Sequence, residues 1–460
     1  MNSSVRNAQR RSVDGLAEKR TRRYRLAGGL SSAWLALAIL LCLDGATVAT
    51  ASGTVDTPAA PAASQDAPDQ SKCDQPSPAP PAGSTDGGVT DPSLRLKFTR
   101  GTTSSGWLPF EYFAGNRVFV PIKINGRAVL ALLDSGASET VIDTSFARAA
   151  GLTPKGKLTG QGEAGSTTYG TVEGVDIKLG DAHWSGGTPV AIDLAAVARQ
   201  LGHPVPVILG GEIFKASVVD LDFGAHRIAF RRPFSYAAPV GAHEVPLTAA
   251  GEIRAITATV EGRPATLVFD LGNAGAIDLY PRFWEQSAFK ARKTSTVLVG
   301  GVGGMSVQKT ALLGDISLGS GRFQSVPARL ENSQYSQNAR CGKLDGNIGM
   351  GILSRFRLIV DFPGNKVLFA RPIDTDTLFP VNHAGVTLRP GEGTATVLYI
   401  APGSPADRAG LKAGAKIDSV DGQPVAAGKS GDWQFGPVGK VIRLHLTNGE
   451  EKDVVLARYF

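Results

Sequence analysis

Two aspartates occupy matching positions in the chain, each after a run of apolar residues and each two positions before a glycine, in Asp134-Ser135-Gly136 and Asp270-Leu271-Gly272. A carboxylate at the end of a buried strand costs free energy unless another group stabilises it. Two such carboxylates facing each other cannot both ionise comfortably, so the pair shares one proton. One can then act as general base on a water molecule while the other donates a proton to a carbonyl oxygen.

Sequence patterns for other chemistries are absent or weak. The six histidines are scattered and form no His-Glu-x-x-His zinc motif, and no Gly-x-Ser-x-Gly elbow offers a serine nucleophile. Cys341 has no histidine signature nearby, so a buried or bridged thiol is expected there. Residues 160–165 fit the Gly-x-Gly-x-x-Gly dinucleotide pattern, but a strand-like sequence follows where a helix would have to begin. We therefore expect neither a metal nor a cofactor.

The two aspartates belong to an internal repeat. A turn glycine precedes each aspartate by eight residues, at Gly126 and Gly262, with an apolar strand between. An Ile-Leu-Gly element ending at Gly210 matches an Asn-Ile-Gly element ending at Gly349, 76 and 79 residues after the respective aspartates. Twelve residues further on, both copies continue with Asp-Phe and end with Arg-Pro. The repeat predicts two homologous β lobes, each with a glycine-rich hairpin, at 160–170 and 300–306.

The first copy also resembles a known family. The sequence from Leu132 to Ala137 resembles the active-site motif of retropepsins and pepsins, and the element ending at Gly210 resembles the one that braces this loop in the same superfamily. The resemblance covers about residues 105–376, as a two-lobed, single-chain bacterial aspartyl protease. It implies catalytic roles for Asp134 and Asp270. It also implies active-site loop support from Ser135, Gly136, Leu271 and Gly272, and flap positions at Gly162, Tyr169 and Gly303.

Leu271 departs from this family pattern, which has threonine or serine between the aspartate and the glycine in both lobes. The missing hydroxyl normally helps to tie the two loops together by hydrogen bonds, so Asp270 is expected to be less firmly oriented than Asp134. Two alternatives stay open. The chain could be a non-catalytic peptide-binding scaffold on a degenerate protease fold, or two first lobes could pair in a homodimer that does not need Asp270.

A separate module is expected after about residue 377. The sequence from Thr396 to Gly422 resembles a bacterial PDZ domain, with a Pro-Gly turn, a short helix opened by Ser404-Pro405 and a turn at Asp421-Gly422. Lys416 stands where an aspartate is usual in that family. PDZ domains bind an extended peptide by strand addition, which implies a C-terminal peptide as partner. The alternative is a module that only packs against the protease lobes.

The net charge of +7 does not indicate a nucleic-acid partner, because residues 1–25 alone contribute +6. Residues 26–43 follow without a charge, and Ala49-Thr50-Ala51 fits a signal-peptidase site. Eighteen residues are also just enough to span a bilayer, so a cleaved signal and a membrane anchor both stay open. Residues 54–93 hold eight prolines and no Leu, Ile, Met or aromatic residue, as expected of a disordered linker. A bridge between Cys73 and Cys341 is possible but not expected.

The fold prediction is a mainly β chain, with two pseudo-repeated retropepsin-like β-barrel lobes followed by a small α+β PDZ domain. The predicted function is that of an exported aspartic endopeptidase, periplasmic or membrane-anchored, acting on peptide or protein substrates. The predicted segments are a signal or anchor at 1–52, a linker at 53–104, lobe 1 at 105–238, lobe 2 at 239–376 and the PDZ domain at 377–460.

Overall fold

A computed structural model of the chain describes residues 95–460, except for 163–164, 287–288, 290–291, 333–342, 373–375 and 426–430. The predicted signal or anchor at 1–52, most of the linker, Cys73 and Cys341 lie outside the described residues. The prediction of a mainly β chain is confirmed, because most of the regular structure consists of strands, which form three sheets, and the helices are short. None of the helices in the described part of the chain is both long and apolar enough to cross a membrane.

The first lobe is built on a sheet whose central strand, β5 (Arg127–Leu133), leads into Asp134. β5 pairs antiparallel with β4 (Arg117–Ile124), and the turn between them contains Asn125 and Gly126, both with positive φ. On its other side β5 pairs parallel with β12 (Val207–Leu209). The remaining strands of this sheet are β1 (Leu96–Phe98), β3 (Glu111–Phe113), β6 (Val141–Asp143), β7 (Lys155–Gly162), β8 (Gly165–Thr171), β9 (Asp176–Leu179), β10 (Ala182–Ser185) and β11 (Val190–Ile192).

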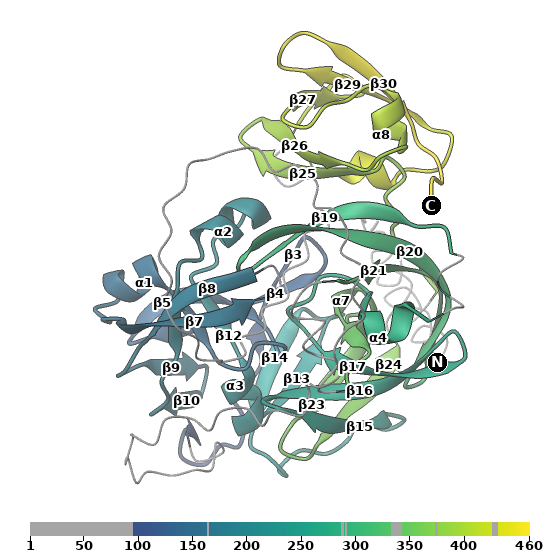
Figure 1. Cartoon of the computed structure of the whole chain (residues 1–460). Helices are drawn as coiled ribbons and strands as arrows, with labels where there is room; N and C mark the ends of the chain where they lie inside the picture. Colours follow the sequence, from purple (N-terminus) through teal and green to yellow (C-terminus); the bar gives the residue numbers. More distant parts are fainter. Residues whose placement is uncertain are drawn as a thin grey trace, which may run out of the picture. The chain divides into compact units, whose positions relative to one another are not determined.

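The second lobe repeats this plan around β17 (Arg263–Phe269), which leads into Asp270. β17 pairs antiparallel with β16 (Ile253–Val260) and parallel with β22 (Gly346–Ile348), as β5 does with β4 and β12. The predicted repeat is therefore confirmed strand by strand. The other strands of this lobe are β15 (His243–Ala250), β18 (Ile277–Leu279), β19 (Ser295–Gly301), β20 (Gly304–Leu318) and β21 (Gly321–Leu330), and Figure 1 labels most of them.

The ends of both repeats form one continuous sheet. The first repeat ends in a hairpin of β13 (Val218–Asp222) and β14 (Arg227–Arg231), and the second ends in β23 (Phe356–Asp361) and β24 (Lys366–Pro372). β13 pairs antiparallel with β23, and β2 (Leu108–Pro109) adds to the outer edge of β14. The sheet that contains lobe 2 therefore includes the last hairpin of lobe 1.

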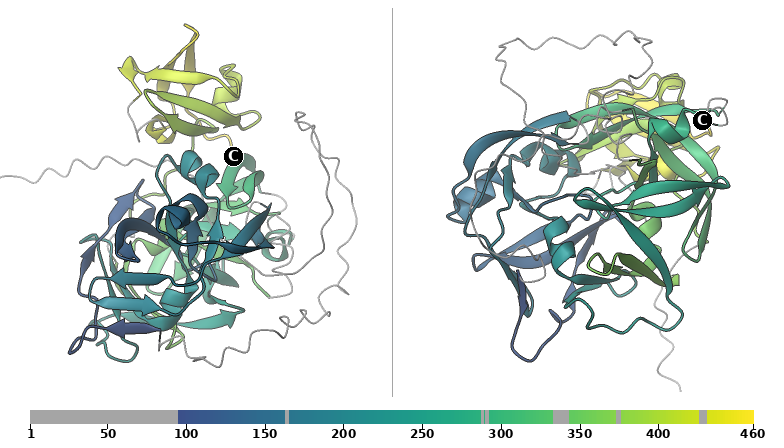
Figure 2. Two further views of the ribbon diagram at one scale, coloured as in Figure 1. Left: turned by 90° about the vertical axis from the view of Figure 1, so that its left-hand side faces the viewer. Right: turned by 60° about the horizontal axis from the view of Figure 1, so that its bottom comes forward.

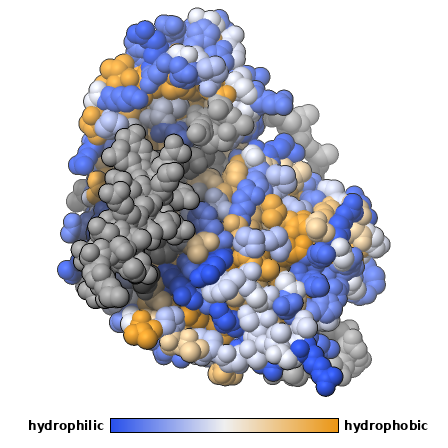
Figure 3. Space-filling view, turned by 180° about the vertical axis from the view of Figure 1, so that it is seen from behind, coloured by the Kyte–Doolittle hydropathy of each residue, from blue (hydrophilic) through white to orange (hydrophobic). Residues whose placement is uncertain are grey.

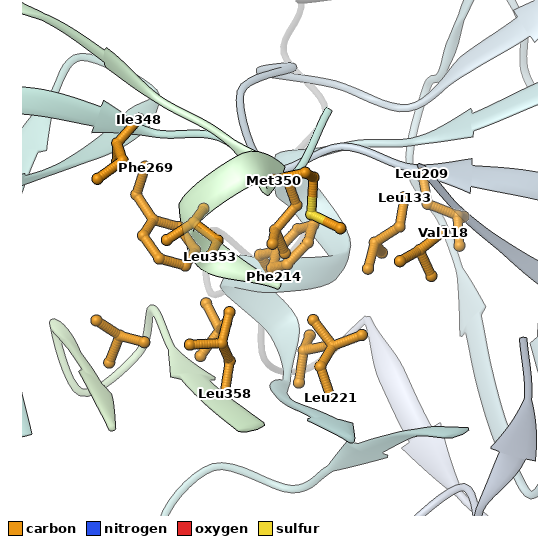
Figure 4. Packing of buried hydrophobic residues seen from close by; sticks show 14 of the residues in the cluster. Val118, Leu133, Leu209, Phe214, Leu221, Phe269, Ile348, Met350, Leu353 and Leu358 are labelled. Carbon is orange, nitrogen blue, oxygen red and sulfur yellow. The ribbon is translucent and has the colours of Figure 1, made fainter. Parts of the chain in front are cut away.

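Apolar side chains from both lobes share one core. Each aspartate is preceded by a buried side chain of that core, Leu133 in lobe 1 and Phe269 in lobe 2, and Figure 4 shows them on either side of Phe214 and Met350. Phe214 belongs to helix α3 (Gly211–Ala216) and Met350 to helix α7 (Met350–Leu353), which follow β12 and β22. Helices α1 (Thr144–Ala149), α2 (Ala195–Leu201) and α4 (Pro281–Trp284) complete the lobes, which Figure 2 shows from two further directions.

The C-terminal module has a six-stranded sheet and an apolar core of its own. Its helix α8 (Pro405–Arg408) begins as predicted, with the Ser404 side chain accepting a hydrogen bond from the backbone N–H of Asp407. Asp421 and Gly422 both adopt positive φ, which confirms the predicted turn. The strands are β25 (Val386–Gly391), β26 (Thr394–Ile400), β27 (Lys416–Val420), β28 (Gln423–Pro424), β29 (Val441–Leu446) and β30 (Glu451–Val455), with a 3₁₀ turn at Asp432–Phe435.

Two predicted boundaries need correction. Residues 96–98, assigned to the linker, form β1 and pair with β10, so the folded region begins before residue 105. Phe379, assigned to the PDZ domain, packs instead in the core of the lobes, with its ring 6.0 Å from that of Phe323. Both wrong boundaries fall at short apolar segments next to polar ones. There the change in amino-acid composition does not coincide with the edge of the packed core. The surface in Figure 3 is mostly hydrophilic with scattered apolar residues, as on an ordinary globular protein.

Candidate active site

Asp134 and Asp270 are held at equivalent places by equivalent contacts. The backbone N–H of Asp134 donates to the carbonyl of Leu209 at 3.0 Å, and that of Asp270 donates to the carbonyl of Ile348 at 3.1 Å. These bonds continue the parallel pairing of β5 with β12 and of β17 with β22 past the ends of the strands. These two strand pairings therefore position the start of each Asp-x-Gly turn.

The two carboxyl groups face each other across the boundary between the lobes. They lie within hydrogen-bonding reach of each other, and both are fully buried. A Cβ atom built on Gly136 would lie 2.5 Å from Cγ of Asp270, and one built on Gly272 would lie 2.2 Å from Cγ of Asp134. Each glycine thus makes room for the carboxyl group of the opposite lobe, which is the physical reason for glycine at both positions.

Within its own turn, each carboxylate accepts two backbone hydrogen bonds on one oxygen. Oδ1 of Asp134 accepts from Gly136 N at 2.9 Å and Ala137 N at 3.0 Å. Oδ1 of Asp270 accepts from Gly272 N at 2.8 Å and Asn273 N at 3.1 Å. The turns therefore fix both carboxyl planes, and Asp270 is oriented as firmly by its own turn as Asp134 is. The expectation of a poorly oriented Asp270 is wrong in this respect.

The hydroxyl of Ser135 joins the two turns from one side only. Its Oγ donates to the carbonyl of Phe269 at 2.8 Å and accepts from the backbone N–H of Leu271 at 2.9 Å. Leu271 has no hydroxyl to return these bonds, and its side chain is instead fully buried in the shared core. The hydrogen bonds of the lobe 1 hydroxyl between the two loops are thus present. At Leu271, apolar packing replaces the hydrogen bonds of a second hydroxyl.

Burial and mutual repulsion shift the protonation of this pair. Removal from water raises the pKa of Asp134 well above its usual value, and the nearby charge of Asp270 raises it further. Burial also raises the pKa of Asp270, but a hydrogen bond from the Asn347 side chain opposes that rise. The raised pKa values favour a state in which the two carboxyls hold a single proton between them, as general acid–base chemistry on water requires.

A network of polar side chains that no sequence motif predicted lies beside Asp270. Nδ2 of Asn347 donates to Oδ2 of Asp270 at 2.7 Å, and Nδ2 of Asn273 donates to Oδ1 of Asn347 at 2.9 Å. Asn273 also donates to Asp278, which pairs with Arg329. The available signal was the asparagine in the Asn-Ile-Gly element, where the first repeat has an isoleucine.

Both predicted hairpins form, and the second reaches the first lobe. β7 and β8 are joined near Gly162, while Gly303 lies in the turn between β19 and β20 with a positive φ. Tyr169 lies on β8, buried in an apolar cluster with Ala137 and Ile208. Val302, from the turn of the lobe 2 hairpin, packs in this same lobe 1 cluster. The carboxyl pair is fully buried in this arrangement.

Comparison with known families agrees with this geometry. A family model described as "Aspartyl protease" matches residues 120–213, from β4 through Asp134 to helix α3. A second, described as "PDZ domain", matches residues 396–435. Residues 120–213 are thus similar to aspartyl proteases, and residues 396–435 are similar to PDZ domains. The aspartyl-protease match ends within lobe 1, so the assignment of lobe 2 rests on the strand-by-strand repeat. A search of curated proteins finds no match.

Proposed function

We propose that the chain is an aspartic endopeptidase that hydrolyses peptide bonds with Asp134 and Asp270. The observation that carries this proposal is the meeting of two buried carboxyl groups, one from each lobe, on turns whose glycines admit the opposite carboxyl. The aspartyl-protease match over the first of these turns supports it. Within the described residues, no group of three or more His, Cys, Asp or Glu side chains is arranged to hold a metal ion.

The chemistry needs one ionised and one protonated carboxyl. The ionised carboxylate takes a proton from a water molecule as the water oxygen bonds to the peptide carbonyl carbon, and the other carboxyl gives its proton to the carbonyl oxygen. The resulting diol is neutral. It collapses when the first aspartate protonates the amide nitrogen and the second regains a proton from a diol hydroxyl, so the C–N bond breaks and both groups return to their starting states.

Substrate access requires the segments that cover the buried carboxyls to move, and we propose that the two hairpins are these segments. An extended peptide is the substrate form that fits between two hairpins, and its backbone can pair with their strands. In the PDZ domain, β25 lies at the edge of its sheet, where strand addition of a peptide can occur. We propose that the PDZ domain docks such peptides, and that the chain acts outside the cytoplasm, as its N-terminal sequence predicts.

Incubation of the full chain with a random peptide library tests this function. We expect cleavage inside the peptides, and inhibition by pepstatin-type compounds, whose hydroxyl mimics one oxygen of the diol. Asp134→Asn should lower turnover by at least a thousandfold, because the turn keeps its shape but loses its titrating group. Equal digestion by the wild-type chain and this variant would rule out the proposal.

A second candidate function is a peptide-binding scaffold without turnover. The full burial of both carboxyls and the apolar Leu271 between the lobes favour it. A scaffold would bind peptides with equal affinity in the wild-type and Asp134→Asn forms and release no products from either. An enzyme would bind in both forms and release products only in the wild type.

A further inference from the structure

The two halves of the site differ in polarity at four matching positions. In lobe 2 these positions hold a continuous hydrogen-bonded network of buried polar side chains: Asn273, Asp278, Arg329 and Asn347. In lobe 1 the strand pairings place an apolar cluster at the corresponding positions: Ala137, Val141, Val190 and Ile208. Besides the difference between Ser135 and Leu271 within the turns, the two halves therefore differ in the residues packed around the aspartates.

The network fixes which end of the Asn347 amide faces Asp270. Oδ1 of Asn273 accepts from Gly275 N at 2.8 Å and from Arg329 Nη2 at 3.0 Å, so its Nδ2 must face the opposite way. That Nδ2 donates to Oδ1 of Asn347, which leaves the Nδ2 of Asn347 to donate to Asp270. The amide orientation is thus set by an arginine and a backbone N–H that can only donate.

Asp134 lacks an equivalent donor in the part of the chain that the structure describes. Among the described residues, no group donates a hydrogen bond to its Oδ2, which is buried. Ile208, the counterpart of Asn347 by strand register, is apolar and cannot supply one. An unpartnered buried carboxylate oxygen is costly, but a protonated carboxyl can satisfy it by donating to a neighbouring carboxylate. Asp270 lies within hydrogen-bonding reach to accept that proton.

We propose that Asn347 is a positioning residue that keeps Asp270 ionised and thereby places the shared proton on Asp134. The acid–base consequence rests on the proposed function. Asp270 then takes the proton from water in the first step, and Asp134 gives its proton to the peptide carbonyl oxygen. In the collapse step Asp270 protonates the leaving nitrogen, and Asp134 regains its proton from the diol. The two lobes thus have fixed and different roles.

The order of titration of the two carboxyls tests this assignment without turnover. The full chain is labelled with aspartate carrying ¹³C in the side-chain carboxyl, and Asp134→Asn and Asp270→Asn assign the two signals. We expect Asp270 to ionise at lower pH than Asp134. In Asn347→Leu the Asp270 midpoint should rise by about one pH unit or more, because one hydrogen bond to a charged group is lost. Ile208→Leu, the matched change in lobe 1, should leave both midpoints unchanged.

If Asp134 ionises first in the wild-type chain, or if Asn347→Leu leaves the Asp270 midpoint unchanged, the assignment is wrong. If Asn347→Leu does not fold, the order in which the two carboxyls ionise in the wild-type chain decides alone whether the assignment holds. Peptide cleavage separates the two proposals. A chain that titrates in the expected order without cleaving peptides contradicts only the hydrolysis, whereas one that cleaves with the opposite order contradicts only the assignment. In an active chain, Asn347→Leu should also move the acidic limb of kcat/KM to higher pH.

Discussion

At the scale of single residues, the Ser135 hydroxyl is the most direct link between the two aspartate turns. It makes two hydrogen bonds to the backbone of lobe 2, at 2.8 and 2.9 Å, and all the groups involved are buried. Because Leu271 offers nothing in return, no second hydroxyl can compensate for its loss. The relative position of the two carboxyls depends on this side chain more than it would in a symmetric pair of turns.

Ser135→Ala should therefore lower both stability and activity. It leaves the Phe269 carbonyl and the Leu271 N–H buried without this partner, at a cost of about 2 kcal/mol in the free energy of unfolding. We also expect kcat to fall at least tenfold, because the carboxyl pair is no longer held in register. Ser235→Ala, which removes an exposed hydroxyl bonded to the Arg232 carbonyl, is the control. Equal effects of both changes on denaturant unfolding and kcat would contradict this role.

The residues of the turns could be predicted from the sequence because their spacing repeats, but the polar network could not. Arg329 and Asn347 lie at least 51 residues after Asn273 and Asp278, and each residue alone is unremarkable in a turn or strand. Only the parallel pairing of β18 with β21 and of β17 with β22 brings them together. The functional importance of Asn347 therefore depends on strand register, which the sequence pattern does not specify.

At the scale of elements, helix α3 carries an acid with a raised pKa close to the Asp134 turn. Glu212, in the first turn of α3, is partly buried, and this burial raises its pKa to about 7. Hydrogen bonds from Thr140 favour its charged form, and the charge of Glu139 opposes it. Nearby, Lys215 of the same helix pairs with Glu252 of lobe 2. Titration of Glu212 on this helix should therefore make the stability of the fold depend on pH.

Glu212→Gln should make the lobes less sensitive to alkaline pH. The folded-state pKa of Glu212 is raised, so the folded protein binds more protons than the unfolded chain between about pH 4.5 and 7. Stability therefore falls as pH rises through that window. We expect the variant to match the wild type at pH 4 and to be about 3 kcal/mol more stable at pH 8. A difference in urea unfolding that is the same at both pH values would contradict this.

The elements around the site were predictable to different degrees. The apolar runs before Asp134 and Asp270 predicted β5 and β17, and the glycine-rich segments predicted both hairpins. The length of β20 and the packing of Val302 in lobe 1 were not predictable, since both depend on contacts between distant parts of the chain.

At the scale of the whole molecule, the two lobes share a core and a sheet, so we expect them to unfold together. Asp220 of β13 connects them, because its carboxylate accepts hydrogen bonds from Arg231 of β14 at 2.9 Å and from Arg357 of β23 at 3.1 Å. The matching ends of the repeats were visible in the sequence. Their pairing with each other was not, because antiparallel register between two distant hairpins leaves no local pattern.

Asp220→Asn should destabilise both lobes in a single transition. Its carboxylate is almost fully buried between two arginines, and removing its charge leaves them without a counterion, at a cost of about 3 kcal/mol. Asp222→Asn is a matched control two residues further along β13, because the side chain of its partner Arg227 is 42% exposed and the pair is worth about 1 kcal/mol or less. Separate transitions for the two lobes, or equal losses in both variants, would contradict the shared sheet as the coupling element.

In the proposed mechanism, Asp134 and Asp270 act on one water molecule as a single unit. The most direct measurement compares kcat/KM for a cleaved peptide in Asp134→Asn, Asp270→Asn and the double variant. Residues that act as one unit give non-additive losses, so each single variant should lose nearly all activity and the double variant should lose no more. An Asp270→Asn chain that cleaves peptide as fast as the wild type, or single losses that add in the double variant, would contradict the paired mechanism.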